Sequence, residues 1–425
     1  MVFKQAMTAL ALVATAMLSV TAPLAAQDIQ TVENPAALGF DPAMLSALDA
    51  RLDALAADGA RPGYAAIIAR GDRIAFVSEA GQADLAHHTP FTVDTPVRIA
   101  SMTKPVTAMA IMMLVERGEI SLDDPVSDYI PAFADMRVAV SPMANEAGDI
   151  ETRPSETIMT IEHLLTHTAG LGYIFESESD LGRLYLENSL YSGDGDLAAR
   201  IDRLAALPLY NDPGDRWQYS YGLDVAGRVI EVVSGTPLNT FLDSEIFTPL
   251  GMTSTGFFFT DVDFDEAALA PLYVHDETGN MVDFEFGSPD WPSGGGGLVS
   301  TASDYIRFAM LLANGGALGD VQLIRPETFA VLSRPHTTAE QTGDWGARGF
   351  ALGMDVVLPP AEGQEPAGVP GDLSWGGFFD TDFFVSPATG TAAVIMTQIQ
   401  PSEHRPEPRT LRIFRPMVYG SFAFD

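Results

Sequence analysis

The chain contains no cysteine among its 425 residues, and only Lys4 and Lys104 are lysines among its 23 basic residues. The lack of cysteine excludes disulfide bonds, thiolate catalysis, cysteine-ligated zinc and a lipid-modified N-terminal cysteine. A chain of this length can bury a core that is stable without cross-links. Because every other basic residue is arginine, Lys104 needs a specific explanation.

Positive charge is scarce in the whole chain. The 57 acidic residues outnumber the basic ones and give a formal net charge of −34. Such a surface repels nucleic acid and anionic lipid headgroups, so neither is an expected partner. A hydrophobic content of 47 % and an aromatic content of 9 % are typical of a folded globular protein.

Long apolar runs are confined to the N-terminus. Lys4 precedes the apolar run Ala6–Val20, and small residues follow as far as Ala26. A buried helix could have a similar middle, but this layout at the start of a chain is typical of a secretory signal peptide over residues 1–26. No later run reaches the roughly 18 apolar residues of a membrane span. We therefore expect a soluble, exported protein of residues 27–425, either periplasmic or secreted.

Strand signals lie near both ends of the chain, and helical signals lie between them. Apolar spacing predicts a helix at 41–58, and two β-rich runs around Gly71-Asp72 predict a hairpin at 63–81. The stretches 373–387 and 390–398 have the composition of paired strands.

This order predicts an α+β fold in which both ends of the chain build one sheet. The sheet region is expected at about 27–105 and 290–425, with a helical region at about 106–289 inserted between them. The chain shows no repeat and no low-complexity linker that would divide it further.

Ser101 and Lys104 form a Ser-x-x-Lys pair at the start of a predicted helix, one turn apart on one face. In a first helical turn the N–H groups are unpaired and carry partial positive charge, so the N–H of Ser101 could hold an oxyanion. Lysine can lose its proton and act as a base, whereas arginine cannot. This difference explains a lysine at position 104 of a chain that otherwise uses arginine.

The alternative is that Ser101 only caps the helix. A capping box would place Glu or Gln at position 104, and a lysine in the first turn opposes the helix dipole. Ser-x-x-Lys alone is a weak pattern, so its surroundings have to decide.

Those surroundings resemble a known family. The segment "RIASMTKPVTAMAIMMLVERGEISLDDPVSDYIPAF" is similar to the nucleophile region of the serine β-lactamase-like superfamily, and most similar to family VIII carboxylesterases, relatives of class C β-lactamases. The resemblance continues in the family's order through "IEHLLTHTAGL", "NDPGDRWQYSYGLDVAGRVIEVVSG" and "SWGGFFDTDFFVSP". It implies the antiparallel sheet flanked by helices of β-lactamases and penicillin-binding proteins.

The resemblance also implies roles for individual positions. Ser101 corresponds to the acyl-accepting serine and Lys104 to its base. Tyr219 begins "YSY" where the superfamily has Tyr-x-Asn, so it corresponds to the second member of the base pair and is expected to share a proton with Lys104. The implied oxyanion hole consists of the backbone N–H groups of Ser101 and Phe378.

The implied substrate-binding residues include two departures from the β-lactamase pattern. Tyr221 replaces an asparagine that contacts the substrate amide, and Trp375 replaces the lysine of the Lys-Thr-Gly strand. Gly376 and Gly377 complete "WGG", a strand that a substrate is expected to approach closely. Both replacements favour neutral esters over β-lactams.

A third departure is "FFD" at 378–380, where small residues such as Ala-Ala-Gly are expected. Phe378 can still offer its N–H group. We expect Phe379 and Asp380 to narrow the cleft or exclude long acyl chains.

Other patterns give weaker indications. His163 and His167 share a helix face, but Leu164 stands where a zinc protease needs Glu, so packing or capping is favoured. The Gly294–Gly297 cluster lacks the Gly-Lys-Ser/Thr of a phosphate loop and indicates a turn where chain segments pass closely. His336 has no assignable place. No metal or organic cofactor is expected.

The sequence thus predicts an exported serine carboxylesterase that cleaves short-chain or small neutral esters through an acyl-enzyme on Ser101. The alternatives are a β-lactamase, a D-alanyl-D-alanine peptidase, or an inactive homologue that binds the cell wall or a partner. The natural ester, its acyl length and the oligomeric state stay open.

Overall fold

The computed structural model describes residues 29–191, 194–257, 268–287, 289–343 and 345–423. The predicted signal peptide lies outside these residues. Within them, no helix is long and apolar enough to cross a membrane.

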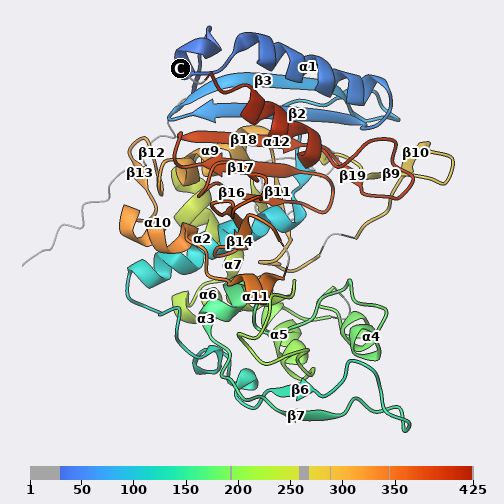
Figure 1. Cartoon of the computed structure of the whole chain (residues 1–425). Coiled ribbons are helices and arrows are strands. Elements are labelled where there is room, and N and C mark those ends of the chain that lie inside the picture. Colours follow the sequence, from blue (N-terminus) through green and yellow to red (C-terminus); the bar gives the residue numbers. More distant parts are fainter. Residues whose placement is uncertain (1–28, 192–193, 258–267, 288, 344, 424–425) are drawn as a thin grey trace, which may run out of the picture.

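A nine-stranded sheet forms the upper part of the molecule, with the strands from the N-terminal end on one side and those from the C-terminal end on the other (Figure 1). All its pairs are antiparallel except β1 with β3. In spatial order the strands are β1 (Gln30–Thr31), β3 (Arg73–Asp84), β2 (Gly63–Arg70), β18 (Thr391–Met396), β17 (Asp382–Ser386), β16 (Leu373–Gly376), β15 (Asp355–Val357) and β14 (Arg348–Phe350), with β4 (Thr89–Pro90) beside β3. The predicted sheet built from both ends is confirmed.

The centre of the sheet is apolar on both faces. Strands β2 and β18, which join the two ends of the chain, are buried along almost their whole length. Their β-rich sequences are near-continuous apolar runs rather than alternating ones, as is typical of strands covered on both sides. The predicted hairpin is β2–β3 with its turn at Gly71-Asp72, while the stretch 373–387 forms two strands, β16 and β17, separated by a turn at 377–381.

Helices cover both faces of this sheet. On one face lie α1 (Pro42–Ala57) and α12 (Leu411–Gly420), and on the other lies α9 (Ala302–Ala313). Helix α1 begins after Asp41, whose side chain accepts from the Ala43 N–H, and its leucines at helical spacing are all buried against the sheet.

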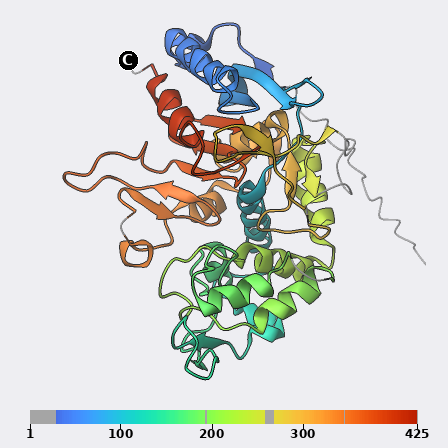
Figure 2. The ribbon, with the colours of Figure 1, turned by 90° about the vertical axis from the view of Figure 1, so that its right-hand side faces the viewer.

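The helical region forms the lower part of the molecule (Figures 1 and 2). Helix α2 (Thr103–Glu116) is buried on all sides from Thr103 to Leu114 and packs against α6 (Gly222–Ser234), which places its start at the junction with the sheet. The other elements there are η3 (Val126–Asp128), η4 (Pro131–Phe133), β6 (Arg137–Ala139), β7 (Thr152–Pro154), α3 (Ile161–Leu165), α4 (Asp180–Glu187), α5 (Leu197–Ala205), α7 (Leu238–Leu242), the π-helix η5 (Asp243–Phe247) and α8 (Thr248–Leu250).

Short elements complete the chain. They are η1 (Pro35–Leu38), β5 (Val97–Arg98), η2 (Ala100–Met102), β8 (Gly256–Phe257), β9 (Tyr273–His275), β10 (Met281–Asp283), β11 (Leu298–Ser300), β12 (Ala317–Leu318), β13 (Val321–Gln322), α10 (Pro326–Ser333), α11 (Ala339–Thr342) and β19 (Ile399–Gln400).

Candidate active site

Ser101 lies in the tight turn η2, directly before the buried helix α2. The turn is fixed from several sides: the Tyr305 hydroxyl donates to the Met102 carbonyl at 2.8 Å, and the Leu298 N–H donates to Thr103 Oγ1 at 3.2 Å. Ala100, just before the serine, has a φ of +44°, a left-handed conformation that is unfavourable for alanine. Such local strain, held in place by its surroundings, is common next to reacting groups.

The three predicted catalytic side chains meet at the Ser101 hydroxyl. The Tyr219 hydroxyl lies 2.6 Å from Ser101 Oγ, and Lys104 Nζ lies 3.3 Å from the same atom. Tyr219 and Ser101 are 118 positions apart in the chain, so only the fold brings them together. Both groups are within reach of the serine proton.

Lys104 is fully buried, with 0 % of its surface exposed. Its Nζ donates to the Gly295 carbonyl at 2.6 Å and lies 4.5 Å from the centre of the Tyr219 ring and 5.5 Å from that of Tyr173. The carbonyl and the two rings stabilise an ammonium group there. This buried, aromatic setting is not that of a surface cation.

Asp224 is a neighbour of Lys104 that the sequence analysis missed. Its carboxylate is buried at the start of α6, and Oδ1 accepts from the Ser293 hydroxyl at 2.6 Å and from the Gly295 N–H at 3.0 Å. Oδ2 has no hydrogen-bond partner among the described residues. Burial raises the pKa of Asp224, while the charge of Lys104 opposes that rise. Gly295 thus connects the two residues: its N–H donates to Asp224, and its carbonyl accepts from Lys104.

The glycine cluster allows this connection. A Cβ atom on Gly294 would lie 2.6 Å from the Leu223 carbonyl oxygen, and one on Gly295 would lie 2.4 Å from Asp224 Oδ2. The prediction that Gly294–Gly297 marks a close passage of chain segments is confirmed.

His163 and His167 have the packing and capping roles that the sequence favoured. His163 completes a capping box with Thr160 at the start of α3. His167 is buried with its ring 4.6 Å from that of Tyr219, and its Nδ1 accepts from the Ser220 N–H. Burial, together with the charge of Lys104, lowers the pKa of His167 well below 6.5, so this imidazole is neutral. The described residues contain no group of three or more potential metal ligands.

His336 is held by two polar contacts, and it is not among the residues that line the cavity at Ser101. Its Nδ1 contacts Glu162 Oε1 at 2.6 Å and its Nε2 contacts the Val331 carbonyl at 2.7 Å. These contacts give it a structural place.

The turn between β16 and β17 brings Phe378 beside the nucleophile. A Cβ on Gly377 would lie 2.4 Å from the Ile99 carbonyl oxygen and 2.1 Å from Thr381 Oγ1, so only glycine fits between the turn and the segment before Ser101. Phe378 and Ser101 line the same cavity, and no acceptor among the described residues takes either backbone N–H. Two free N–H groups at the nucleophile are the donors that an oxyanion needs.

The other residues of "FFD" divide between two environments. Phe379 lines the cavity with Phe378 and packs against Phe286, their ring centres 5.1 Å apart. Asp380 has a φ of +68° and turns away to a buried ion pair with Arg61, 2.8 Å from Arg61 Nε. The expectation that both residues narrow the cleft is therefore wrong for Asp380.

The predicted substrate-binding residues Trp375, Gly376 and Tyr221 do not line the cavity. Trp375 instead lies next to the Tyr219 ring. Trp375 on β16 packs on the Tyr219 ring at 5.8 Å, with Gly376 following it in the strand. Tyr221 is fully buried, and its hydroxyl lies 3.0 Å from Ser189 Oγ. A contact of these residues with substrate stays a prediction. Ser189, which contacts Tyr221, does line the cavity.

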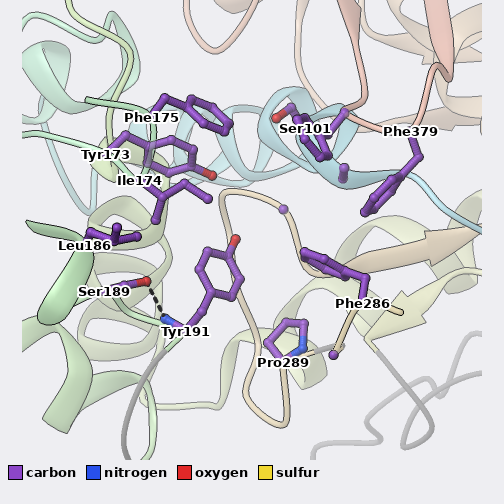
Figure 3. A pocket seen from close by; sticks show the side chains of 14 residues that line it. Ser101, Tyr173, Ile174, Phe175, Leu186, Ser189, Tyr191, Phe286, Pro289 and Phe379 are labelled. Carbon is purple, nitrogen blue, oxygen red and sulfur yellow. Dashed lines mark hydrogen bonds between the residues drawn. The ribbon is translucent and has the colours of Figure 1, made fainter. Parts of the chain in front are cut away.

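A cavity of about 430 Å³ opens at Ser101 (Figure 3). Figure 3 shows aromatic side chains from several loops around the serine. The lining residues Phe175 and Leu186 are 54 % and 46 % exposed, so part of the cavity wall is in contact with solvent. The lining residues are Ala100, Ser101, Tyr173, Ile174, Phe175, Leu186, Ser189, Tyr191, Phe286, Gly287, Pro289, Gly296, Phe378 and Phe379, and none of them carries a charge.

Comparisons with known proteins show the family of the chain. The chain matches the Beta-lactamase family over residues 48–415. It is 34 % identical over 389 residues to Esterase EstB of Burkholderia gladioli, covering 86 % of this chain and 93 % of EstB. It is also 34 % identical over 357 residues to protein Rv1367c of Mycobacterium tuberculosis, covering 80 % of this chain and 86 % of that protein.

A solved structure gives the same answer for the fold. EstCE1, described as a hydrolase with promiscuous acyltransferase activity, superimposes with a TM-score of 0.72 at 28 % identity, over 89 % of this chain and 99 % of EstCE1. The resemblance found in the sequence is confirmed: the chain belongs to the beta-lactamase family and has esterases among its relatives.

Proposed function

We propose that the protein is a serine carboxylesterase that cleaves small neutral esters through an acyl-enzyme on Ser101. One observation carries the proposal: Ser101 Oγ lies 2.6 Å from the Tyr219 hydroxyl and 3.3 Å from Lys104 Nζ, at an apolar cavity. A nucleophile with two proton-accepting groups in hydrogen-bond reach is the arrangement of covalent acyl transfer.

The reaction proceeds in two halves. Ser101 Oγ attacks the ester carbonyl carbon while the Tyr219/Lys104 pair takes its proton, and the N–H groups of Ser101 and Phe378 stabilise the oxyanion. The carbon–oxygen bond to the alcohol breaks, and the pair returns the proton to the leaving oxygen. Water then attacks the acyl-enzyme by the same route in reverse, giving the carboxylic acid and free Ser101.

The uncharged cavity favours a neutral ester over a β-lactam. A β-lactam carries a carboxylate, which is costly to place among apolar side chains without a cation. Lys104 is the one lysine of the described residues, and the Gly295 carbonyl and Ser101 hydroxyl already occupy it. Trp375 stands where β-lactamases have a lysine, and its ring packs on Tyr219. The same argument disfavours a D-alanyl-D-alanine peptidase.

The alternative that is not an enzyme is an inactive homologue that binds the cell wall or a partner. Such a protein would need neither a buried lysine nor a tyrosine hydroxyl 2.6 Å from a serine. Burying an ammonium group costs free energy that a pure binding function does not repay.

The test is a comparison of ester and β-lactam turnover. The wild-type protein is expected to hydrolyse p-nitrophenyl butyrate and to cleave a chromogenic cephalosporin poorly, and Ser101→Ala should remove the ester activity. The same assay with acetate, butyrate, octanoate and laurate esters measures the acyl length that the cavity accepts. Efficient cephalosporin cleavage would instead favour a β-lactamase, and no turnover at all would favour the binding homologue.

We also propose that the protein is exported, periplasmic or secreted. The apolar run Ala6–Val20 behind Lys4 supports this. Mass spectrometry of the mature protein from its host tests it: cleavage after Ala26 is expected, and an intact N-terminus in the cytoplasm would contradict it.

A further inference from the structure

Arg409 contacts the peptide unit that supplies one donor of the proposed oxyanion hole. Its Nη2 donates to the Gly377 carbonyl at 2.6 Å. The Gly377 carbonyl and the Phe378 N–H belong to the same peptide bond. The described residues contain no cis peptide, so this bond is trans and the two groups point in opposite directions. Arg409 therefore bonds to the side of the peptide opposite to the Phe378 N–H.

We propose that Arg409 is a positioning residue that orients and polarises the Gly377–Phe378 peptide, so that the Phe378 N–H is a stronger oxyanion donor. This inference rests on the proposed esterase function. A cation bonded to a carbonyl oxygen draws electron density along the conjugated peptide and leaves the N–H more positive. A more positive N–H stabilises a developing oxyanion more than a neutral ground-state carbonyl.

The guanidinium of Arg409 is held in a fixed place by Asp380. Its Nε lies 3.2 Å from Asp380 Oδ1, and the same carboxylate lies 2.8 Å from Arg61 Nε. Asp380 also accepts from the Thr410 N–H at 3.1 Å and from the Thr410 hydroxyl at 2.7 Å. Arg61 and Asp380 are 2 % and 3 % exposed. The aspartate that departs from the expected small residue is thus the anchor of Arg409.

The peptide itself has little freedom to rotate. The Gly377 N–H donates to the Thr381 carbonyl at 2.8 Å, which closes the turn on one side of the peptide. Gly377 also lies close against the Ile99 carbonyl, two positions before Ser101. With the turn closed and the Gly377 carbonyl bonded to Arg409, the orientation of the Phe378 N–H is fixed.

A purely structural role is the competing explanation. In that case Arg409 only attaches the segment before α12 to the turn, and its loss would change stability or substrate affinity without weakening transition-state stabilisation. The kcat and the rate at which a fluorophosphonate phosphonylates Ser101 separate the two roles. Phosphonylation passes through a charged phosphoryl oxygen and needs no turnover.

The experiment compares Arg409→Gln with the matched control Arg412→Gln, since Arg412 lies in the same segment and is exposed. Loss of a whole oxyanion donor costs about 100- to 1,000-fold in kcat, so weakening one donor should cost roughly 10-fold. Arg409→Gln is expected to lower kcat for p-nitrophenyl butyrate and the phosphonylation rate by this factor, with KM within about twofold, and Arg412→Gln to match the wild type.

The outcomes are distinguishable. Wild-type kcat and phosphonylation in a folded Arg409→Gln protein overturn the inference and leave the esterase proposal intact. A wild-type protein that neither turns over esters nor reacts with the probe overturns both. If Arg409→Gln does not fold, Arg409→Met takes its place: methionine keeps an aliphatic stem but has neither a charge nor a donor for the Gly377 carbonyl, so a loss of threefold or more supports the inference and wild-type rates contradict it.

Discussion

At the scale of single residues, the chemistry depends on how charge is arranged around one buried lysine. Lys104 has a carbonyl, two aromatic rings and the serine hydroxyl around its ammonium group, and Asp224 lies behind Gly295. In the proposed mechanism the Tyr219/Lys104 pair takes the serine proton. The Asp224 carboxylate places a negative charge behind this pair, connected to Lys104 through Gly295.

Replacement of Asp224 tests this charge arrangement. Asp224→Asn keeps an acceptor for Ser293 and Gly295 but removes the negative charge, so kcat for ester hydrolysis should fall about 10-fold. Because burial raises the pKa of the Asp224 carboxyl above 3.8, the wild type should lose activity on the acid side at a higher pH than an ordinary carboxyl would cause. The pH–rate profile of Asp224→Asn should lack this decline. Ser293→Ala, which removes a hydrogen bond but no charge, should retain it; identical profiles for all three proteins would contradict the account.

The buried imidazole of His167 predicts a loss of stability in mild acid. Its pKa is lowered in the folded protein, while in the unfolded chain it takes up a proton near 6.5. The unfolded state therefore binds more protons below that pH, and this contribution to the free energy of unfolding, complete above pH 6.5, falls by up to about 1.4 kcal/mol per pH unit as the pH drops. Urea unfolding between pH 5 and 8 checks this.

The control is His167→Gln. Other shifted groups, including His163 and Asp224, titrate in both proteins, so the difference between the two pH dependences isolates His167. The variant should be less stable at pH 8 but lose less stability on acidification. Parallel pH dependences would show that His167 becomes charged in the folded state.

At the scale of elements, the turn between β16 and β17 contacts two other parts of the chain. Gly377 packs against Ile99, just before Ser101, and the turn is bonded to Arg409 and Thr410, just before α12. The Asp380 carboxylate of this turn neutralises Arg61, which is buried next to Thr410, the residue before α12. A buried charge that loses its partner is strongly destabilising, whereas an exposed ion pair contributes little.

The prediction is a large loss of stability for Asp380→Ala. Without the carboxylate, Arg61 stays buried and unpaired, so the free energy of unfolding should fall by about 3–5 kcal/mol in urea titrations. Glu407→Gln, which removes an ion pair with Arg51 that is one-third exposed on each side, is the control and should cost less than about 1 kcal/mol. Equal, small losses in both variants would mean that Arg61 finds other compensation.

The contacts of the site that lie within one element or one motif could be predicted from the sequence, whereas those between separate segments could not. The proximity of Ser101 and Lys104 could be predicted because they lie one helical turn apart, and that of Tyr219 because a family motif marks it. Asp224 carries no such signal, since its link to Lys104 passes through Gly295 from a third segment. Arg409 and Gly377 are 32 positions apart, and nothing in their spacing indicates contact. "FFD" was noticed as a departure, but the left-handed conformation that turns Asp380 away from the cavity and toward Arg61 is visible only in the structure.

At the scale of the whole molecule, the sheet could be predicted because the β-rich runs lie at both ends of the chain. Neither end alone has enough strands to bury its apolar side chains, so the two ends pair in one sheet. The order of the strands and the split of 373–387 into β16 and β17 could not, since a turn without a strong turn signal separates them. The cavity wall was equally hidden, because its aromatic residues come from separate loops and the fold alone assembles them.

The net charge of −34 predicts that salt stabilises the protein. Screening shortens the reach of the repulsion from roughly 30 Å at 0.01 M salt to about 3 Å at 1 M. The melting temperature should therefore rise by a few degrees between 0.01 and 0.5 M NaCl at pH 7. The rise should shrink at pH 5, where part of the carboxylates are protonated. A fall in melting temperature with salt would show that ion pairs outweigh the repulsion.

The central claim is that Lys104 serves as part of a proton-accepting pair, and Lys104→Arg tests it most directly. Arginine keeps the positive charge but cannot give up its proton. The measurement is the steady-state hydrolysis of p-nitrophenyl butyrate by wild type, Lys104→Arg and Ser101→Ala, with the folded state of each checked by thermal unfolding. We expect both folded variants to lose the activity almost completely. A folded Lys104→Arg protein with wild-type kcat would contradict the account, because a fixed cation would then suffice at this position.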